Sequence, residues 1–171
     1  MPAAEVARFL NEHFALVDRC VELWEGTIDK YIGDSVMAFW GAPEEQVDHA
    51  ARACRAALGI VAALCADNEN RARRGCAPVR IRMGIHSGRA LVGNIGAPSR
   101  INYTVVGDVV NVAERLEELA RDVAGENEYA CILVSGDTAG RLGAGFELVP
   151  VGRRVLRGRA EPLDAFRLQV P

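Results

Sequence analysis

The sequence predicts an α+β fold, in which helices flank a mainly antiparallel sheet, from three observations. Segments with helical apolar periodicity are interleaved with short strand-like runs, and the first strand-like runs form hairpins broken by glycine turns. The 171 residues, of which 50% are hydrophobic, suffice for one domain with its own core. From this order of elements we expect the helices to lie on one side of the sheet.

The N-terminal elements follow from spacing and turn chemistry. Apolar residues recur at helical spacing over residues 4–25, and Gly26 ends this first expected helix. Residues 27–32 and 35–40 are expected strands, because the Gly33-Asp34 pair between them is typical of a tight hairpin turn. An alanine-rich stripe predicts a long second helix over residues 44–74.

The remaining elements are predicted in the same way. Residues 79–106 are strand-like, with a hairpin expected around Ser87-Gly88. Asp108 is the expected N-cap of a helix over residues 109–123. The short elements that follow are a strand at 131–135, a helix at 136–142, and strands at 146–151 and 162–168.

Composition excludes several classes of protein. The net charge of −3 provides no basic surface for a nucleic-acid backbone, so no nucleic-acid partner is expected. The five cysteines are never spaced as Cys-x-x-Cys, which argues against a disulfide scaffold or a thiolate zinc site and favours a cytoplasmic compartment. No uninterrupted apolar run approaches the roughly 20 residues of a membrane span.

Two motifs could carry chemistry. Asp34 in its turn would project a carboxylate that a hard cation can bind together with phosphate oxygens, although Gly-Asp is also a common structural turn. Asn111 and Arg115 share one helix face and could donate to an oxygen-rich ligand, or Arg115 could simply pair with Glu118 on the surface.

Two further segments are rich in arginine. Arg82 and His86 stand among strand residues, and His86 is more readily a structural hydrogen-bonding group than a catalyst. Arg157 and Arg159 flank a glycine and suit either an anion or a solvated turn. Neither a P-loop nor a Gly-x-Gly-x-x-Gly loop is present, so arginine and metal would have to hold any phosphate.

In this order, the segments KYIGDSVMAFWG, VRIRMGIHSGRALVGNIG, NYTVVGDVVNVAERLE and VLRGRAEPLDAFRL resemble the catalytic domain of class III nucleotidyl cyclases over essentially the whole chain. The pattern is most similar to bacterial and soluble adenylate cyclases with Thr at the second purine-selecting position. The resemblance implies an α+β domain related to the ferredoxin-like polymerase palm. It also implies a homodimer that binds ATP at its interface.

The resemblance assigns roles to individual residues. Lys30 and Thr104 match the pair that selects adenine, and Lys30 is the single lysine of this arginine-rich chain. Asp34 matches the second of two aspartates that bind Mg²⁺ or Mn²⁺. Asn111 matches the residue that orients the ribose, and Arg115 the one that stabilises the pentacoordinate phosphorus.

Arg82 and Arg157 match cations that hold the triphosphate, although the family more often has Lys where Arg157 stands. The implied reaction converts ATP to 3′,5′-cyclic AMP and pyrophosphate by two-metal phosphoryl transfer. An upstream regulatory domain in the full-length protein is part of the same expectation.

The resemblance is incomplete at the N-terminus. The family's first strand, which carries the first metal-binding aspartate, has no counterpart, and neither Asp18 nor Asp29 is expected to replace that residue. We therefore expect residues 1–171 to be a single, N-terminally truncated cyclase domain with impaired activity and unpaired strand edges. The alternative is a non-catalytic dimerisation or nucleotide-sensing module. A diguanylate cyclase is disfavoured because its Gly-Gly-Asp/Glu-Glu-Phe signature is absent.

Overall fold

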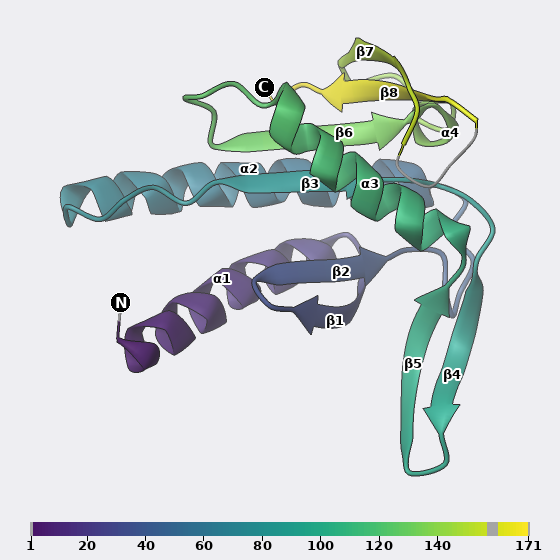
Figure 1. Cartoon of the computed structure of the whole chain (residues 1–171), viewed down its shortest axis with the longest axis horizontal. Helices are drawn as coiled ribbons and strands as arrows, with labels where there is room; N and C mark the ends of the chain where they lie inside the picture. Colours follow the sequence, from purple (N-terminus) through teal and green to yellow (C-terminus); the bar gives the residue numbers. More distant parts are fainter. Residues whose placement is uncertain (1, 157–160, 171) are drawn as a thin grey trace.

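The structure is a computed structural model that describes residues 2–156 and 161–170. Its chain order is α1 (Ala3–Leu23), β1 (Thr27–Ile32), β2 (Ser35–Phe39), α2 (His49–Arg73), β3 (Ile81–Ile85), β4 (Leu91–Ala97), β5 (Arg100–Val106), α3 (Asp108–Val123), β6 (Ala130–Ser135), α4 (Gly136–Ala139), β7 (Leu148–Arg154) and β8 (Leu163–Leu168). The predicted mixture of helices and mainly antiparallel strands is confirmed (Figure 1).

The core is built on a four-stranded sheet of order β3-β6-β8-β7, in which only the β3–β6 pair is parallel. Alternation along the buried strand β6 sends Ile132 and Val134 to one face, where they pack with α2 residues. Cys131 and Leu133 face the other side and pack with α3. The expectation of helices on one side only is therefore wrong, because β6 is apolar at successive positions and both of its faces need cover.

The first hairpin forms a separate two-stranded sheet. Gly33 has a φ of 64° in its turn, a conformation that glycine adopts without strain. The apolar face of α1, through Val17 and Val21, packs on this hairpin and on β3. Within the described residues β2 and β3 share no strand pairing, so the hairpin is held beside the main sheet by side-chain packing alone (Figure 1).

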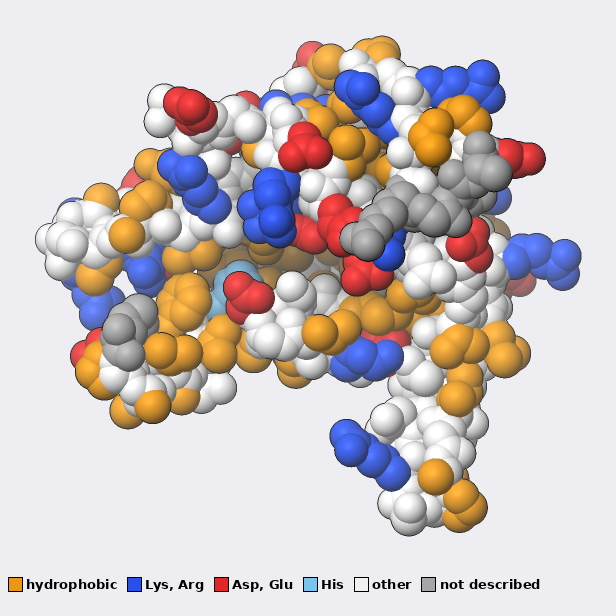
Figure 2. All heavy atoms as spheres, in the orientation of Figure 1, with side chains coloured by type: hydrophobic (Ala, Val, Ile, Leu, Met, Phe, Trp, Pro, Cys, Tyr) orange, Lys and Arg blue, Asp and Glu red, His pale blue; other side chains and the backbone are white. Residues whose placement is uncertain are grey.

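The second hairpin consists of β4 and β5, which pair from Leu91↔Val106 to Ala97↔Arg100. The predicted turn at Ser87-Gly88 is wrong, because β3 pairs with β6 and not with β4. The spacing of glycines could not reveal this partner, which lies far along the chain. The hairpin projects from the body of the molecule, as Figures 1 and 2 show.

Two helix starts differ from the expected ones. The second helix begins at His49, because Gln46 holds the preceding segment in a loop by accepting from the Gly41 N–H and donating to the Glu25 carbonyl. The third helix already includes Asp108, and Gly107, with a φ of 147°, occupies the cap position.

Helix α2 is long and apolar enough by composition to cross a bilayer. Half of its most apolar window is buried inside the protein, as for the core helix of a globular domain. Its Cys54, Ala57 and Val61 pack against the four-stranded sheet, which accounts for the apolar stripe.

Candidate active site

Lys30 on β1 and Thr104 on β5 are brought together, although 74 residues separate them in the sequence. The Lys30 ammonium donates to Thr104 Oγ1 at 2.9 Å. Thr104 Oγ1 in turn donates to Asp29 Oδ2 at 2.7 Å, a length typical of a charge-assisted hydrogen bond. The three side chains form a continuous polar cluster that links the two hairpins.

Asp29 is the buried member of this cluster. Its side chain is 1% exposed, whereas that of Lys30 is 43% exposed. Oδ2 accepts from Thr104, from Lys30 at 3.2 Å and from the Val105 N–H at 3.4 Å. Among the described residues Oδ1 accepts no hydrogen bond, and its 3.2 Å approach to the ammonium is an electrostatic contact without hydrogen-bond geometry.

An irregularity in β1 makes the cluster possible. Ile28 pairs with Ala38 and Lys30 with Met37, so the register shifts and Asp29 is left as the extra residue of a β-bulge. In a regular strand, consecutive side chains point to opposite faces, and Asp29 and Lys30 could not both reach one hydroxyl. The bulge removes this constraint.

Asn111 and Arg115 lie on α3, as predicted, outside the stripe of Val112, Leu116 and Ala120 that enters the core. Arg115 Nη1 donates to both carboxylate oxygens of Glu118 at 2.8 Å. Hydrogen bonding to Glu118 raises the pKa of Arg115 further above its already high value. The surface pairing considered as the plain alternative for Arg115 is thus present in the single chain.

Arg82 is placed on β3, where its Nε donates to Glu117 of α3 at 3.2 Å. His86 lies just beyond β3 and bonds Ser135 Oγ through Nδ1 at 2.7 Å, in keeping with its expected structural role. The predicted site residue Arg157 lies outside the described residues.

Asp34 occupies the exposed turn between β1 and β2. Burial lowers the pKa of the nearby His13, and the charges of Asp34 and Asp67 oppose that shift without overcoming it. Within residues 2–156 and 161–170, no group of three or more acidic, histidine or cysteine side chains forms a ready metal site. A single exposed carboxylate still suits Mg²⁺, which proteins commonly hold through one or two carboxylates together with substrate phosphates.

Sequence reasoning missed Asp29, which it treated only as a failed substitute for the first metal-binding aspartate. The available signal was its position directly before the single lysine. A bulge cannot be read from that spacing, and in a regular strand Asp29 would lie on the opposite face from Lys30.

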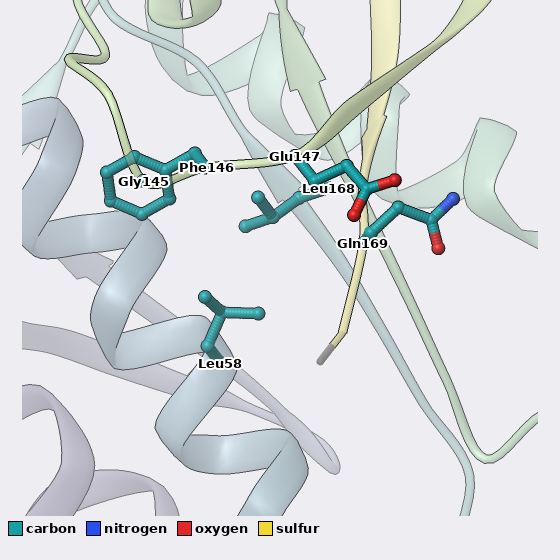
Figure 3. A pocket seen from close by; sticks show the side chains of 6 residues that line it. All are labelled: Leu58, Gly145, Phe146, Glu147, Leu168 and Gln169. Atoms are coloured by element: carbon teal, nitrogen blue, oxygen red, sulfur yellow. The ribbon is translucent and has the colours of Figure 1, made fainter.

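A groove of about 490 Å³ lies elsewhere, between α2 and the C-terminal end of β8. Figure 3 shows Leu58 and Leu168 facing one another across it, with Phe146 beside them and the polar ends of Glu147 and Gln169 turned away from Leu58. None of its lining residues belongs to the predicted site. We therefore take the polar cluster, and not this groove, as the centre of the candidate site.

Two proteins named as adenylate cyclases are similar to this chain over almost its full length. Adenylate cyclase 1 of Rhizobium meliloti (strain 1021) is 38% identical over 164 residues, covering 96% of this chain and 24% of its own length. The adenylate cyclase of Anabaena cylindrica is 31% identical over 177 residues, covering 99% of this chain and 33% of its own length. The chain thus spans 24% and 33% of the lengths of these two relatives.

Solved structures show the same fold. The adenylyl cyclase CyaB from P. aeruginosa superposes with a TM-score of 0.84 at 28% identity, covering 99% of this chain and 84% of that one. The guanylyl cyclase Cya2 gives a TM-score of 0.85 at 29% identity, covering 98% and 82%. The fold is thus shared by enzymes named for either purine, so purine choice has to come from individual side chains.

The sequence profile described as the adenylate and guanylate cyclase catalytic domain matches residues 1–169. Together with the superposed cyclase structures and the α+β architecture, this match shows that the chain belongs to the class III adenylate and guanylate cyclase catalytic domain family.

Proposed function

We propose that this chain is an adenylate cyclase catalytic domain that converts ATP to 3′,5′-cyclic AMP and pyrophosphate in the cytoplasm, as a homodimer with its active sites at the interface. The observation that carries the proposal is the contact between Lys30 and Thr104, at 2.9 Å. These are the two positions at which the family resemblance expects adenine to be selected. The two relatives named above as adenylate cyclases support the same choice of substrate.

The helix α3 would supply the groups that act on the sugar and the phosphorus. Asn111 would orient the ribose, so that its 3′ oxygen forms a bond to the α-phosphorus while the bond from that phosphorus to the pyrophosphate oxygen breaks. The hydroxyl proton is released to solvent. Arg115 would meet the charge that develops on the phosphorus, and the forked guanidinium suits phosphate oxygens.

The triphosphate would be held by arginines and by a divalent cation. Arg82 and Arg157 would contact the phosphates, and Asp34 would hold Mg²⁺ or Mn²⁺ jointly with phosphate oxygens. When bound, the cation would supply positive charge to the attacking oxygen and the leaving phosphates. A second cation, expected in the family, would need a carboxylate besides Asp34.

A homodimer is supported by the projecting β4–β5 hairpin (Figure 2). Four of its large hydrophobic side chains are exposed in the single chain, namely Leu91, Ile101, Tyr103 and Val106. Exposed apolar side chains concentrated on one element are typical of an interaction surface. The hairpin also carries Thr104, so a partner packed on it would lie beside the purine-selecting cluster.

The experiment is an assay of the purified protein for cyclic AMP with Mg²⁺-ATP and with Mn²⁺-ATP. Asp34→Ala is the matched control, because it removes the proposed cation ligand from an exposed turn. We expect cyclic AMP from the unmodified protein and a large loss in the control. The proposed activity is contradicted if the unmodified protein forms no more cyclic AMP than the Asp34→Ala variant.

The purine assignment has its own test. Lys30→Glu combined with Thr104→Cys should weaken the preference for ATP and permit some use of GTP, because donors and acceptors facing the base are altered. An unchanged ratio of ATP to GTP turnover contradicts the assignment of this pair.

A second candidate function is a non-catalytic dimerisation or nucleotide-sensing module. It is favoured by the engagement of Arg115 with Glu118 and by the lack, among the described residues, of a group of three or more side chains that could hold a metal ion. Tight ATP binding without turnover would support this module. Cyclic AMP formation that depends on Asp34 would exclude it.

A further inference from the structure

We infer that Asp29 is the positioning residue for purine selection: it fixes the Thr104 hydroxyl as a hydrogen-bond acceptor toward the base, so that a threonine acts as a carboxylate would. The inference rests on the proposed function and deepens it. It follows from the cluster in which Thr104 Oγ1 lies 2.7 Å from Asp29 Oδ2 and 2.9 Å from Lys30 Nζ.

The direction of each hydrogen bond is set by chemistry. An ammonium group only donates, so Thr104 Oγ1 must accept from Lys30. A carboxylate only accepts, so the single Thr104 hydroxyl hydrogen is directed at Asp29. One lone pair of Oγ1 then remains, and no hydrogen remains that Thr104 could offer to a ligand.

The direction of these hydrogen bonds matters because a hydroxyl that is free to rotate does not discriminate between purines. Adenine presents an amino donor at C6, whereas guanine presents a carbonyl acceptor at the same position. A freely rotating hydroxyl can accept from the first or donate to the second. With its hydrogen held by Asp29, Thr104 can accept from the adenine amino group but meets the guanine carbonyl as one acceptor facing another.

The burial of Asp29 keeps this arrangement in place. The carboxylate is 1% exposed and lies in a bulge, so neither water nor the nucleotide can take over its hydrogen bonds. Thr104 is itself 7% exposed, and the half-exposed Lys30 is the member of the cluster that a ligand meets first. Asp29 therefore acts through Thr104 and not by touching the base.

The primary test is Asp29→Leu, which is close to Asp in shape but has no acceptor. Released from Asp29, the hydroxyl can turn toward the guanine carbonyl, so the ratio of kcat/KM for ATP to that for GTP should fall about tenfold, the effect of one hydrogen bond. The ratio does not depend on the fraction of folded protein. Asp164→Asn, which alters an exposed carboxylate on β8, should leave it unchanged.

A double-mutant cycle separates positioning from a general structural role. If Asp29 acts through the hydroxyl, Asp29→Leu should change the ATP-to-GTP ratio less than twofold in a Thr104→Val background. The inference is overturned if Asp29→Leu lowers kcat/KM equally for ATP and for GTP. It is also overturned if Asp29→Leu changes the ATP-to-GTP ratio tenfold both with Thr104 and with Thr104→Val.

A second variant keeps Asp29 intact in case Asp29→Leu does not fold. Thr104→Asn introduces an amide that could face the base with either end. Asp29 should take its NH₂ group and leave its carbonyl as the acceptor, so the ATP preference should stay well above that of Thr104→Val. A preference no higher than that of Thr104→Val overturns the inference.

Binding measurements keep this test distinct from the test of turnover. The affinities of α,β-methylene ATP and α,β-methylene GTP, measured by calorimetry, should show the same tenfold change in ratio. An unchanged binding ratio in Asp29→Leu rejects the role of Asp29 even where cyclic AMP is produced. A changed ratio supports it even where turnover is absent, and binding of neither analogue by the unmodified protein rejects both proposals.

Discussion

At the scale of single residues, the cationic groups of the proposed site are engaged by neighbouring carboxylates. Arg115 bonds Glu118 and Arg82 bonds Glu117, and both pairs lie at the surface. Exposed ion pairs contribute little to stability, because water screens them and holding two long side chains costs entropy. A triphosphate can therefore displace these carboxylates, so the observed pairing is compatible with a role in phosphate chemistry.

The role of Arg115 can be measured directly. Arg115→Ala should lower kcat by about 10²–10³, as expected when a donor to a developing oxyanion is removed, with little change in KM for ATP. Arg121→Ala is the matched control, because Arg121 lies on the same helix near its C-terminal end. Steady-state kinetics provide the measurement. Similar kcat values for Arg115→Ala and Arg121→Ala would contradict a role for Arg115 in the proposed mechanism.

At the scale of elements, the position of α3 depends on its close approach to β3. A Cβ atom at Gly84 would lie 2.1 Å from the Ala113 carbonyl oxygen and 2.5 Å from the Glu117 nitrogen, both of which are backbone atoms. Only glycine permits this contact. Because α3 also carries Asn111 and Arg115, the packing at Gly84 sets where those groups stand relative to the sheet.

Gly84→Ala should consequently destabilise the protein by about 3 kcal/mol or more, since overpacking against backbone cannot be relieved by a side-chain rotation. Gly93→Ala is the matched substitution, because a Cβ atom there meets nothing within 4 Å. Urea denaturation should place the Gly93→Ala midpoint close to that of the unmodified protein. Equal midpoints for the two variants would contradict the tight contact.

A second element-scale contact joins the loop before β6 to β8. Arg167 and the Gly125 N–H both donate to Glu128, at 2.7 Å each, and hold the pKa of this carboxyl below its usual range. A lowered folded-state pKa contributes stability above the unfolded value of about 4.3. That contribution is lost as the pH falls through the lower folded-state pKa.

Glu128→Gln should therefore lower the free energy of unfolding at pH 7 by less than about 1 kcal/mol, because the pair is partly exposed. The difference from the unmodified protein should narrow as the pH is lowered below about 4.3. Urea midpoints measured across this range provide the comparison, with Glu126→Gln in the same loop as the control. A difference that is independent of pH would show that the ion pair is not its cause.

At the scale of the whole molecule, the proposed homodimer would bring together residues from separate parts of two chains. The β4–β5 hairpin projects with exposed apolar side chains, and α3 and both hairpins carry residues of the proposed site (Figure 1). If the sites form between two chains, Asp34 of one chain acts with Asn111 and Arg115 of the other. Mixing defective variants tests this division.

Asp34→Ala and Arg115→Ala should each be inactive alone and should recover about a quarter of the unmodified activity when mixed in equal amounts. Half of the dimers in such a mixture are heterodimers, each with one intact site of two. Arg115→Ala mixed with Asn111→Ala should recover nothing, because both defects fall on the same side of each site. If sedimentation shows that dimers are present and neither mixture recovers activity, the sites are not shared between chains.

Local patterns predicted most elements because their signals are local. The tight turn at Gly33-Asp34, the apolar stripe of α1 and the helix bearing Asn111 all follow from neighbouring residues, and the structure confirms them. The hairpin placed at Ser87-Gly88 was wrong because a strand's partner is chosen by long-range packing, and β3 pairs with β6. The expectation of helices on one side of the sheet was wrong for a related reason. Strand β6 is buried on both faces, so its sequence does not alternate between polar and apolar residues, and its pattern does not show which faces the helices cover.

By itself, the sequence determined the α+β class and the family resemblance, and it suggested the residues proposed to meet a nucleotide, because these depend on composition and on ordered motifs. Only the tertiary structure decided that Asp29 joins Lys30 and Thr104. That outcome requires a bulge in β1 and the approach of β5, a strand more than 70 residues away. Strand register and hydrogen-bond direction arise from the packed fold, and on them rests our inference that Asp29 sets the choice of purine.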